Sequence, residues 1–155
     1  MDTILTVKAE DLARLSPQEA VNFFREMLWA EATALGIGIN LINVPGAITV
    51  GDGGIDAEVR DVPINGGQGI VKQGLTRYQI KTGEFVLSED HHIKEILFRV
   101  SALKKGRLEL KPKIQSCLDE DGTLVVVLFG WDNPDPKEQF REKFVAELIA
   151  IDPKC

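Results

Sequence analysis

This chain of 155 residues lacks most features that membrane, secreted or zinc-binding proteins need. Its apolar runs stay well short of the roughly 20 residues that cross a bilayer as a helix, so we expect no membrane partner. The N-terminal stretch MDTILTVKAED is acidic and has no signal-peptide pattern, which predicts a cytoplasmic protein. Two cysteines, Cys117 and Cys155, make neither a disulfide framework nor a zinc site, and Cys117 is expected to be a small core residue.

Positive charge is also scarce, because 18 lysines and arginines face 24 aspartates and glutamates, and the net charge is −6. Proteins that bind DNA tightly on their own usually present a net basic surface, so this chain is not expected to be one of them. The middle of the chain is more basic than its ends and permits a local positive patch. Its basic residues are Arg77, Lys81, Lys94, Lys104, Lys105, Arg107, Lys111 and Lys113.

The order of apolar and turn-forming segments predicts a single α/β domain over 1–155, with helices packed against a mixed sheet. The first helix is expected to begin with the capping box of Ser16 and Glu19 and to end at Gly36. The expected elements are a helix at 16–35, a short strand within 39–50, strands at 55–60 and 76–81, helices at 88–105 and 111–120, an apolar strand at 123–131 in the centre of the sheet, and a helix at about 136–151.

Two segments carry the polar residues that point to a function, GDGGIDAEVRD at 51–61 and TRYQIKTGEF at 76–85. Both alternate apolar and polar residues, as half-buried strands do. If they pair as antiparallel neighbours through their short glycine-rich connection, Asp56, Gln79 and Lys81 share one surface. The apolar members of both strands should face the core: Ile55, Ala57, Val59, Tyr78 and Ile80.

A carboxylate, an amide and an ammonium on one surface suit phosphodiester hydrolysis. Asp56 can ligate Mg²⁺, which prefers carboxylate oxygens, and Gln79 offers a neutral carbonyl oxygen two residues from Lys81. The ammonium of Lys81 can orient the attacking water or stabilise charge that develops on the phosphoryl group.

In this order and phase, Gly-Gly-Ile-Asp followed by Tyr-Gln-Ile-Lys resembles the PD-(D/E)XK nuclease superfamily, in its Mrr-like branch, where Gln replaces the second acidic residue. The resemblance implies a restriction-endonuclease-like fold, a three-layer sandwich with its core at about 16–130. It implies a deoxyribonuclease that uses Mg²⁺ or Mn²⁺, held by Asp56, Gln79, Ile80 and a glutamate of the first helix, with Lys81 in the catalytic set.

Two glutamates compete for that last position. At about 100° per residue, Glu31 falls roughly 40° from Met27, inside the expected apolar stripe of the helix. Glu26 falls about 100° to the other side, away from the stripe. A carboxylate that faces a core needs a compensating partner, so Glu31 is preferred. Glu26, which the spacing common in the family favours, is the second choice.

Neighbouring polar residues have simpler explanations. Asp52 sits in the glycine-rich turn and is expected to serve that turn. Glu58 shares the face of Asp56 and is a candidate for a second metal or a water. His91 and His92 could bind metal, but adjacent helical residues diverge by about 100°, so a surface role at a helix start is favoured.

The sequence therefore predicts a metal-dependent DNA endonuclease domain. The resemblance implies an effector of a prokaryotic restriction or anti-phage system, and the helix that ends the sequence suggests further sensor or NTPase domains and possible homo-oligomers. One alternative is a catalytically silent module of the same fold, in which Asp56 and Lys81 form an ordinary cross-strand ion pair worth ~0.2–1 kcal/mol. A small-molecule hydrolase is disfavoured, because the sequence has no G-x-S-x-G, no P-loop and no Ser-His-Asp set.

Overall fold

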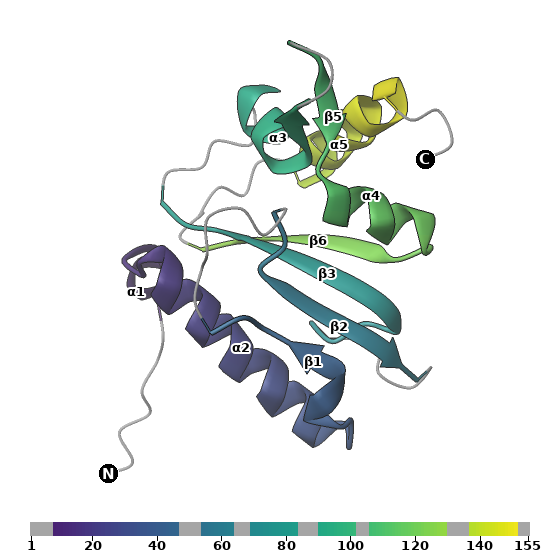
Figure 1. Cartoon of the computed structure of the whole chain (residues 1–155). Helices are drawn as coiled ribbons and strands as arrows, with labels where there is room; N and C mark the ends of the chain where they lie inside the picture. The colour runs from purple at the N-terminus through teal and green to yellow at the C-terminus, as the bar shows by residue number, and fades with distance from the viewer. Residues whose placement is uncertain are drawn as a thin grey trace.

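The computed structural model describes residues 8–46, 54–63, 69–83, 90–101, 106–129 and 137–151, and these form a mixed α/β fold (Figure 1). None of their helices is long and apolar enough to cross a membrane. The elements are α1 (Ala9–Ala13), α2 (Pro17–Ala34), the 3-10 helix η1 (Ile39–Leu41), β1 (Ile42–Asn43), β2 (Ala57–Val62), β3 (Gly74–Lys81), α3 (Asp90–Leu97), β4 (Phe98–Val100), β5 (Leu108–Leu110), α4 (Pro112–Asp119), β6 (Thr123–Leu128) and α5 (Lys137–Ile151).

Helix α2 begins and ends where its capping residues predict. Ser16 accepts a hydrogen bond from the backbone of Glu19, and the Glu19 carboxylate accepts the Ser16 N–H at 2.8 Å, which completes the capping box. At the other end Gly36 has a φ of +68°, and the N–H of Ile37 bonds to the carbonyl of Ala32 at 2.8 Å. This is a Schellman motif, so both predicted ends are confirmed.

The main sheet has the strand order β1-β2-β3-β6 (Figure 1). β1, β2 and β3 are antiparallel, and β6 runs parallel to β3. The predicted pairing of the two motif strands is confirmed, with Ala57 opposite Tyr78. The register shifts between Val59 and Val62, where Asp61 has a φ of +60°, as expected at a bulge.

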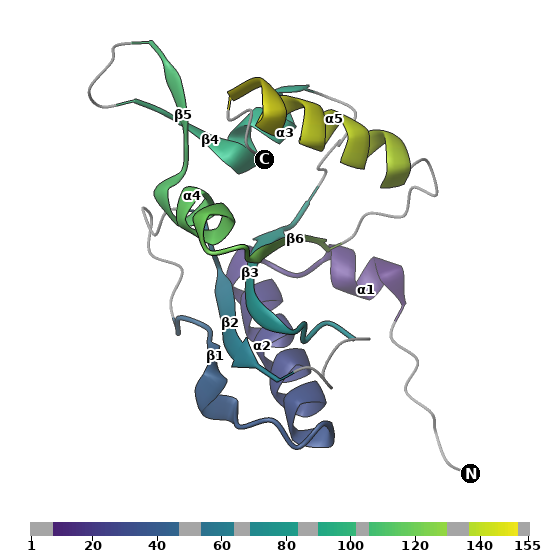
Figure 2. The ribbon, with the colours of Figure 1, turned by 90° about the vertical axis from the view of Figure 1, so that its right-hand side faces the viewer.

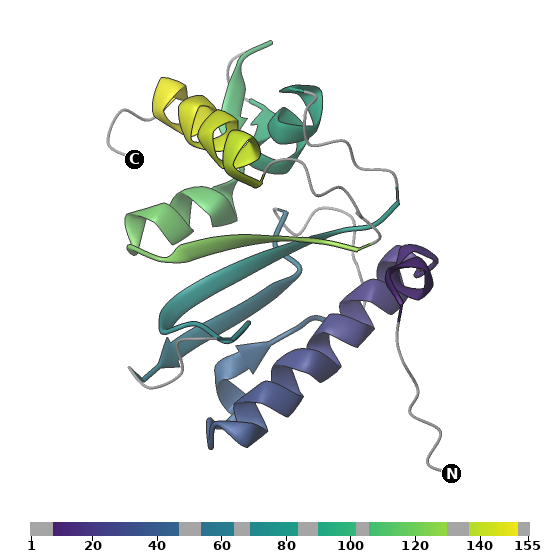
Figure 3. The same ribbon diagram turned by 180° about the vertical axis from the view of Figure 1, so that it is seen from behind.

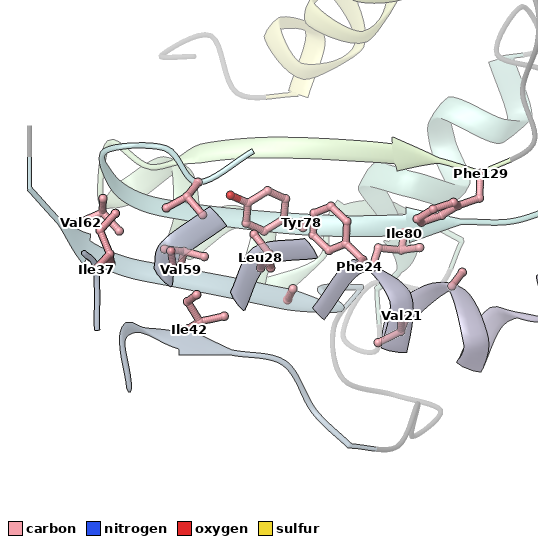
Figure 4. Packing of buried hydrophobic residues seen from close by; sticks show 14 residues of the cluster. Val21, Phe24, Leu28, Ile37, Ile42, Val59, Val62, Tyr78, Ile80 and Phe129 are labelled. Carbon is pink, nitrogen blue, oxygen red and sulfur yellow. The ribbon is translucent and has the colours of Figure 1, made fainter. Parts of the chain in front are cut away.

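Helices cover both faces of this sheet, and α2 lies on the side opposite α4 and α5 (Figure 3). Between α2 and the sheet lies a first hydrophobic cluster, in which the rings of Phe24 and Tyr78 stand 5.1 Å apart (Figure 4). The second cluster lies on the other face, among α3, α4 and α5. Its buried members are Ile55, Ile93, Ile96, Leu97, Phe98, Leu110, Ile114 and Leu148.

The expected apolar stripe of α2 needs a correction. Met27 and Leu35 are exposed, so the stripe is rotated by roughly 70°, less than one residue position. Glu31 still flanks the rotated stripe, whereas Glu26 lies on the opposite side and is exposed. The residues that pack on the sheet are Ala20, Val21, Phe24, Leu28 and Ala32.

Two other expectations were wrong. The helix expected over 88–105 ends at Leu97, and the chain continues as β4, which pairs with β5 in a separate ribbon beside α3 (Figure 2). The strand is defined by its pairing, with Phe98 opposite Leu110 and Val100 opposite Leu108. Phe98 is buried in the second cluster while Val100, two residues further along, is 66% exposed, so burial ends within the ribbon. β6 lies at the edge of the described sheet rather than in its centre. Its continuous apolar run reflects coverage of both faces, since Val125 and Val127 pack on the first cluster and its other apolar residues on the second.

Candidate active site

Asp56 stands where the chain enters β2. Its backbone N–H donates to the carbonyl of Tyr78 at 2.8 Å, and its carboxylate Oδ2 accepts the N–H of Ile80 at 2.7 Å. Ile55 packs in the second cluster and Ala57 in the first, so the side chains on either side of Asp56 point to opposite faces of the sheet. Ile55 was expected to share the face of Ala57, and the irregular entry to β2 explains why it does not. These bonds place the Asp56 carboxylate against the part of β3 that carries Gln79 and Lys81.

Gln79 is buried, with 2% of its surface exposed, and it lies on β3, one of the two inner strands of the sheet. Its side-chain oxygen Oε1 is fully buried and has no hydrogen-bond partner in the part of the chain that the structure describes. Leaving a buried polar group unsatisfied costs about 1–3 kcal/mol, so such groups are rare and call for an explanation. An amide oxygen without a donor, on the residue between the two that bond to Asp56, fits a ligand of a hard cation.

Lys81 leaves the same strand and meets α3. Its Nζ lies 3.1 Å from Oε1 of Glu95, and its side chain is 20% exposed. Glu95 was not singled out from the sequence. Ile93, Ile96 and Leu97 turn the buried side of α3 toward the second cluster, while Glu95 stays exposed, and no local spacing connects it with Lys81.

Lys111, the residue that precedes α4, reaches the same place from another direction. Its Nζ donates to the backbone carbonyl of Glu95 at 2.7 Å. Its stem crosses Gly54, where an added Cβ would lie 2.6 Å from Cδ and 3.0 Å from Nζ of Lys111. Gly54 also has a φ of +81°, a backbone conformation that favours glycine, and a side chain there would displace the stem of Lys111.

The carboxylate of Glu31 is hydrogen-bonded to the loop that precedes β3. Its Oε2 accepts the backbone N–H groups of Ile70 at 2.8 Å and Val71 at 3.1 Å. An added Cβ at Gly69 would lie 1.4 Å from Oε1, so the loop fits against the carboxylate only with glycine there. The partner that a core-facing carboxylate requires is therefore a pair of backbone amides. A metal-binding role for Glu31 stays a prediction.

Glu58 is engaged by arginines. Arg77 lies 2.6 Å and Arg60 3.2 Å from its carboxylate, and the buried Arg77 also donates to the Lys113 carbonyl and to Ser116 Oγ in α4. Burial raises the pKa of Glu58, but the hydrogen bonds and charges of the two arginines outweigh it and hold that pKa below its usual range. These contacts tie β2, β3 and α4 together. A second metal or a water at Glu58 stays a prediction.

The remaining candidates are less informative. Ile80 packs its side chain in the first cluster, so it can reach a metal only through its carbonyl oxygen. Asp52 and the side chains of His91 and His92 lie outside the described residues. Among the residues that are described, no three His, Cys, Asp or Glu side chains group as a metal site, so a metal here would depend on one carboxylate and neutral oxygens.

The described site thus combines Asp56, a buried amide oxygen and two ammonium groups around Glu95, a set that can polarise and hold a phosphate ester. No protein-family model, no curated protein and no solved structure gives a significant match to the chain.

Proposed function

We propose that this chain is a metal-dependent DNA endonuclease domain that hydrolyses phosphodiester bonds. The observation that carries the proposal is the buried Oε1 of Gln79, which has no hydrogen-bond partner within the part of the chain that the structure describes, between two residues of β3, Tyr78 and Ile80, whose backbones bond to Asp56. The topology supports it: a helix, an antiparallel β1-β2-β3 unit, further helices and a strand parallel to β3 follow the order that the PD-(D/E)XK resemblance implies (Figure 1).

The residues present fit Mg²⁺ or Mn²⁺. The carboxylate of Asp56 and the amide oxygen of Gln79 would hold the ion, together with the carbonyl of Ile80, because hard cations take oxygen ligands. When bound, such an ion supplies positive charge to the phosphoryl oxygens and makes a coordinated water more acidic.

The protein's own contribution to the chemistry would come from Lys81. Its ammonium would orient the attacking water or stabilise the charge that builds up on the phosphoryl group. The ion pair with Glu95 fixes the direction of this side chain, so less rotamer freedom is lost when substrate binds.

The setting of this activity is proposed from the resemblance. We infer a cytoplasmic effector of a prokaryotic restriction or anti-phage system, in which further sensor or NTPase domains, or a second copy of the chain, supply recognition and control. The net charge of −6 supports dependence on such partners, because DNA is a polyanion.

A catalytically silent module of the same fold is the second candidate. One observation favours it: the carboxylate of Glu31 already accepts two backbone amides, which leaves Asp56 as the carboxylate beside Gln79. Such a module would bind nucleic acid or mediate assembly without cutting.

A plasmid assay separates the two candidates. Supercoiled DNA is incubated at low salt with wild type, Asp56→Ala, Lys81→Ala and, as a control, Glu142→Ala on the exposed surface of α5. We expect nicking that needs Mg²⁺ or Mn²⁺, stops with EDTA, and falls on the order of 10²-fold or more in the first two variants but not in the control. Equal nicking by wild type and Asp56→Ala would place the activity elsewhere.

A further inference from the structure

The contacts around Asp56 close into a ring that includes a second lysine. The Asp56 carboxylate accepts the N–H of Ile80, the residue before Lys81. Lys81 pairs with the side chain of Glu95, and Lys111 bonds to the carbonyl of the same glutamate. The stem of Lys111 then crosses Gly54, two residues before Asp56. Two ammonium groups from different elements are thus brought to one place beside the candidate site.

Lys111 is fixed in this position at both ends. Its backbone N–H donates to the carbonyl of Leu97 at 2.9 Å, and its Nζ donates to the carbonyl of Glu95 in the last turn of α3. The bond to the Glu95 carbonyl fixes the position of the Lys111 ammonium. Because a carbonyl carries no formal charge, this bond does not neutralise the ammonium. A lysine that is ordered before substrate arrives gives up less conformational entropy on binding.

We propose that Lys111 binds a backbone phosphate of the nucleic acid at the candidate site. This inference rests on the proposed function, and it divides the work between the two cations. Lys81, on the strand that carries Gln79, serves the reacting phosphoryl group, and Lys111, which bonds to the backbone carbonyl of Glu95, holds the phosphodiester in register. An acidic protein can attract a polyanion only through cations gathered at the point of contact.

The test measures binding apart from cleavage. Lys111→Met keeps the apolar stem across Gly54 and removes the ammonium, and Lys143→Met removes the same charge from the exposed surface of α5. Fluorescence anisotropy with a short DNA duplex is followed across NaCl concentrations in EDTA. We expect the slope of log affinity against log salt to become shallower by about 1 in Lys111→Met, while Lys143→Met and Lys111→Arg keep the wild-type slope.

A second measurement needs no variant and so does not depend on whether Lys111→Met folds. Wild-type protein is acetylated with an amine-specific reagent, with and without the duplex, and each lysine is read by mass spectrometry. DNA should slow modification of Lys111 several-fold and leave Lys143 unaffected.

The two possible failures are distinguishable. If wild type binds DNA but Lys111 is neither protected nor needed for the salt slope, the inference is overturned and the plasmid assay still decides the proposed function. If wild type neither binds nor cuts DNA, both fall together.

Discussion

At the scale of single residues, Gln79 permits one substitution to test both stability and the proposed activity. Because its buried Oε1 lacks a partner in the described part of the chain, an apolar side chain of similar length removes an unsatisfied group. We expect Gln79→Met to raise the free energy of unfolding by about 1 kcal/mol, measured by urea unfolding, and to lower metal-dependent nicking. Gln115→Met is the matched control, since the amide of Gln115 bonds to Asp119 at 3.0 Å. A Gln79→Met protein that is less stable than wild type would contradict this account of the amide.

Glu31 and Gly69 should be energetically coupled. Gly69→Ala places a methyl group against the Glu31 carboxylate, and Glu31→Ala leaves two amides of the loop unpaired, each change costing about 1–3 kcal/mol. We expect the double variant to be more stable than the sum of the single effects predicts, because the methyl group no longer meets a carboxylate. Urea unfolding of the four proteins gives the coupling.

A related variant tests the metal role of Glu31. Glu31→Gln keeps an oxygen for the loop amides but removes the charge. Loss of nicking at unchanged stability would support the predicted ligand, whereas unchanged nicking would restrict Glu31 to holding the loop.

Only some residues of the candidate site could be predicted from the sequence pattern. Gln79 and Lys81 lie on β3 and Asp56 directly precedes β2, and because the pairing of these two strands could be predicted, so could the closeness of the three residues. Glu95 and Lys111 could not, because each meets the site through the packing of α3 and α4 on the sheet. Helical geometry placed Glu31 rather than Glu26 beside the packed face of α2, but it could not show that the Glu31 carboxylate accepts two backbone N–H groups of a loop. The metal role for which Glu31 was selected stays a prediction.

At the scale of elements, the end of α2 offers a clean test of backbone strain. Gly36 has a φ of +68° and open space around its Cα, so Gly36→Ala should cost about 1–2 kcal/mol through conformation alone. Gly46 also has open space, without a positive φ, and Gly46→Ala should be neutral or slightly stabilising. Thermal unfolding by circular dichroism compares the two. Equal melting temperatures would mean that the cap of α2 contributes little.

Helices and strands with local sequence patterns could be predicted from the sequence. Strands that form only by pairing with a distant strand could not. The capping residues of α2 and the alternation of β2 and β3 are local. The ribbon β4–β5 depends on a partner strand beyond Gly106, with Arg99 and Glu109 paired across it at 2.8 Å. The continuous apolar run of β6 indicates that both faces of this strand are covered. It does not indicate whether the strand lies at the edge or in the centre of the sheet, because its neighbours are set by pairing.

At the scale of the whole molecule, acid should loosen the fold through Glu58. The folded-state pKa of Glu58 lies below 4.5, so its stabilising contribution is present above that pH and is lost as the pH falls through the folded pKa. We expect Glu58→Gln to be about 1–3 kcal/mol less stable than wild type at pH 7, with the difference shrinking toward pH 3. Urea unfolding over this range measures it.

Glu109→Gln is the control for that series. Hydrogen bonding by Ser101 lowers the pKa of Glu109, as does Arg99, but this carboxylate lies on the exposed ribbon rather than between β2, β3 and α4. Its variant should stay close to wild type at every pH. If both variants behaved alike, the arginine contacts of Glu58 would not be what links stability to pH.

The opposite orientation of the Ile55 and Ala57 side chains also has a consequence for protein synthesis. The side chains that flank Asp56 are anchored in different clusters, and the second cluster needs α3, α4 and α5, which leave the ribosome after β3. A nascent chain that has emerged only through β3 has no support for Ile55 and no Glu95 or Lys111. If the proposed function holds, the catalytic geometry cannot assemble before translation of this domain is nearly complete, and truncated products are harmless to the genome of the cell that makes them.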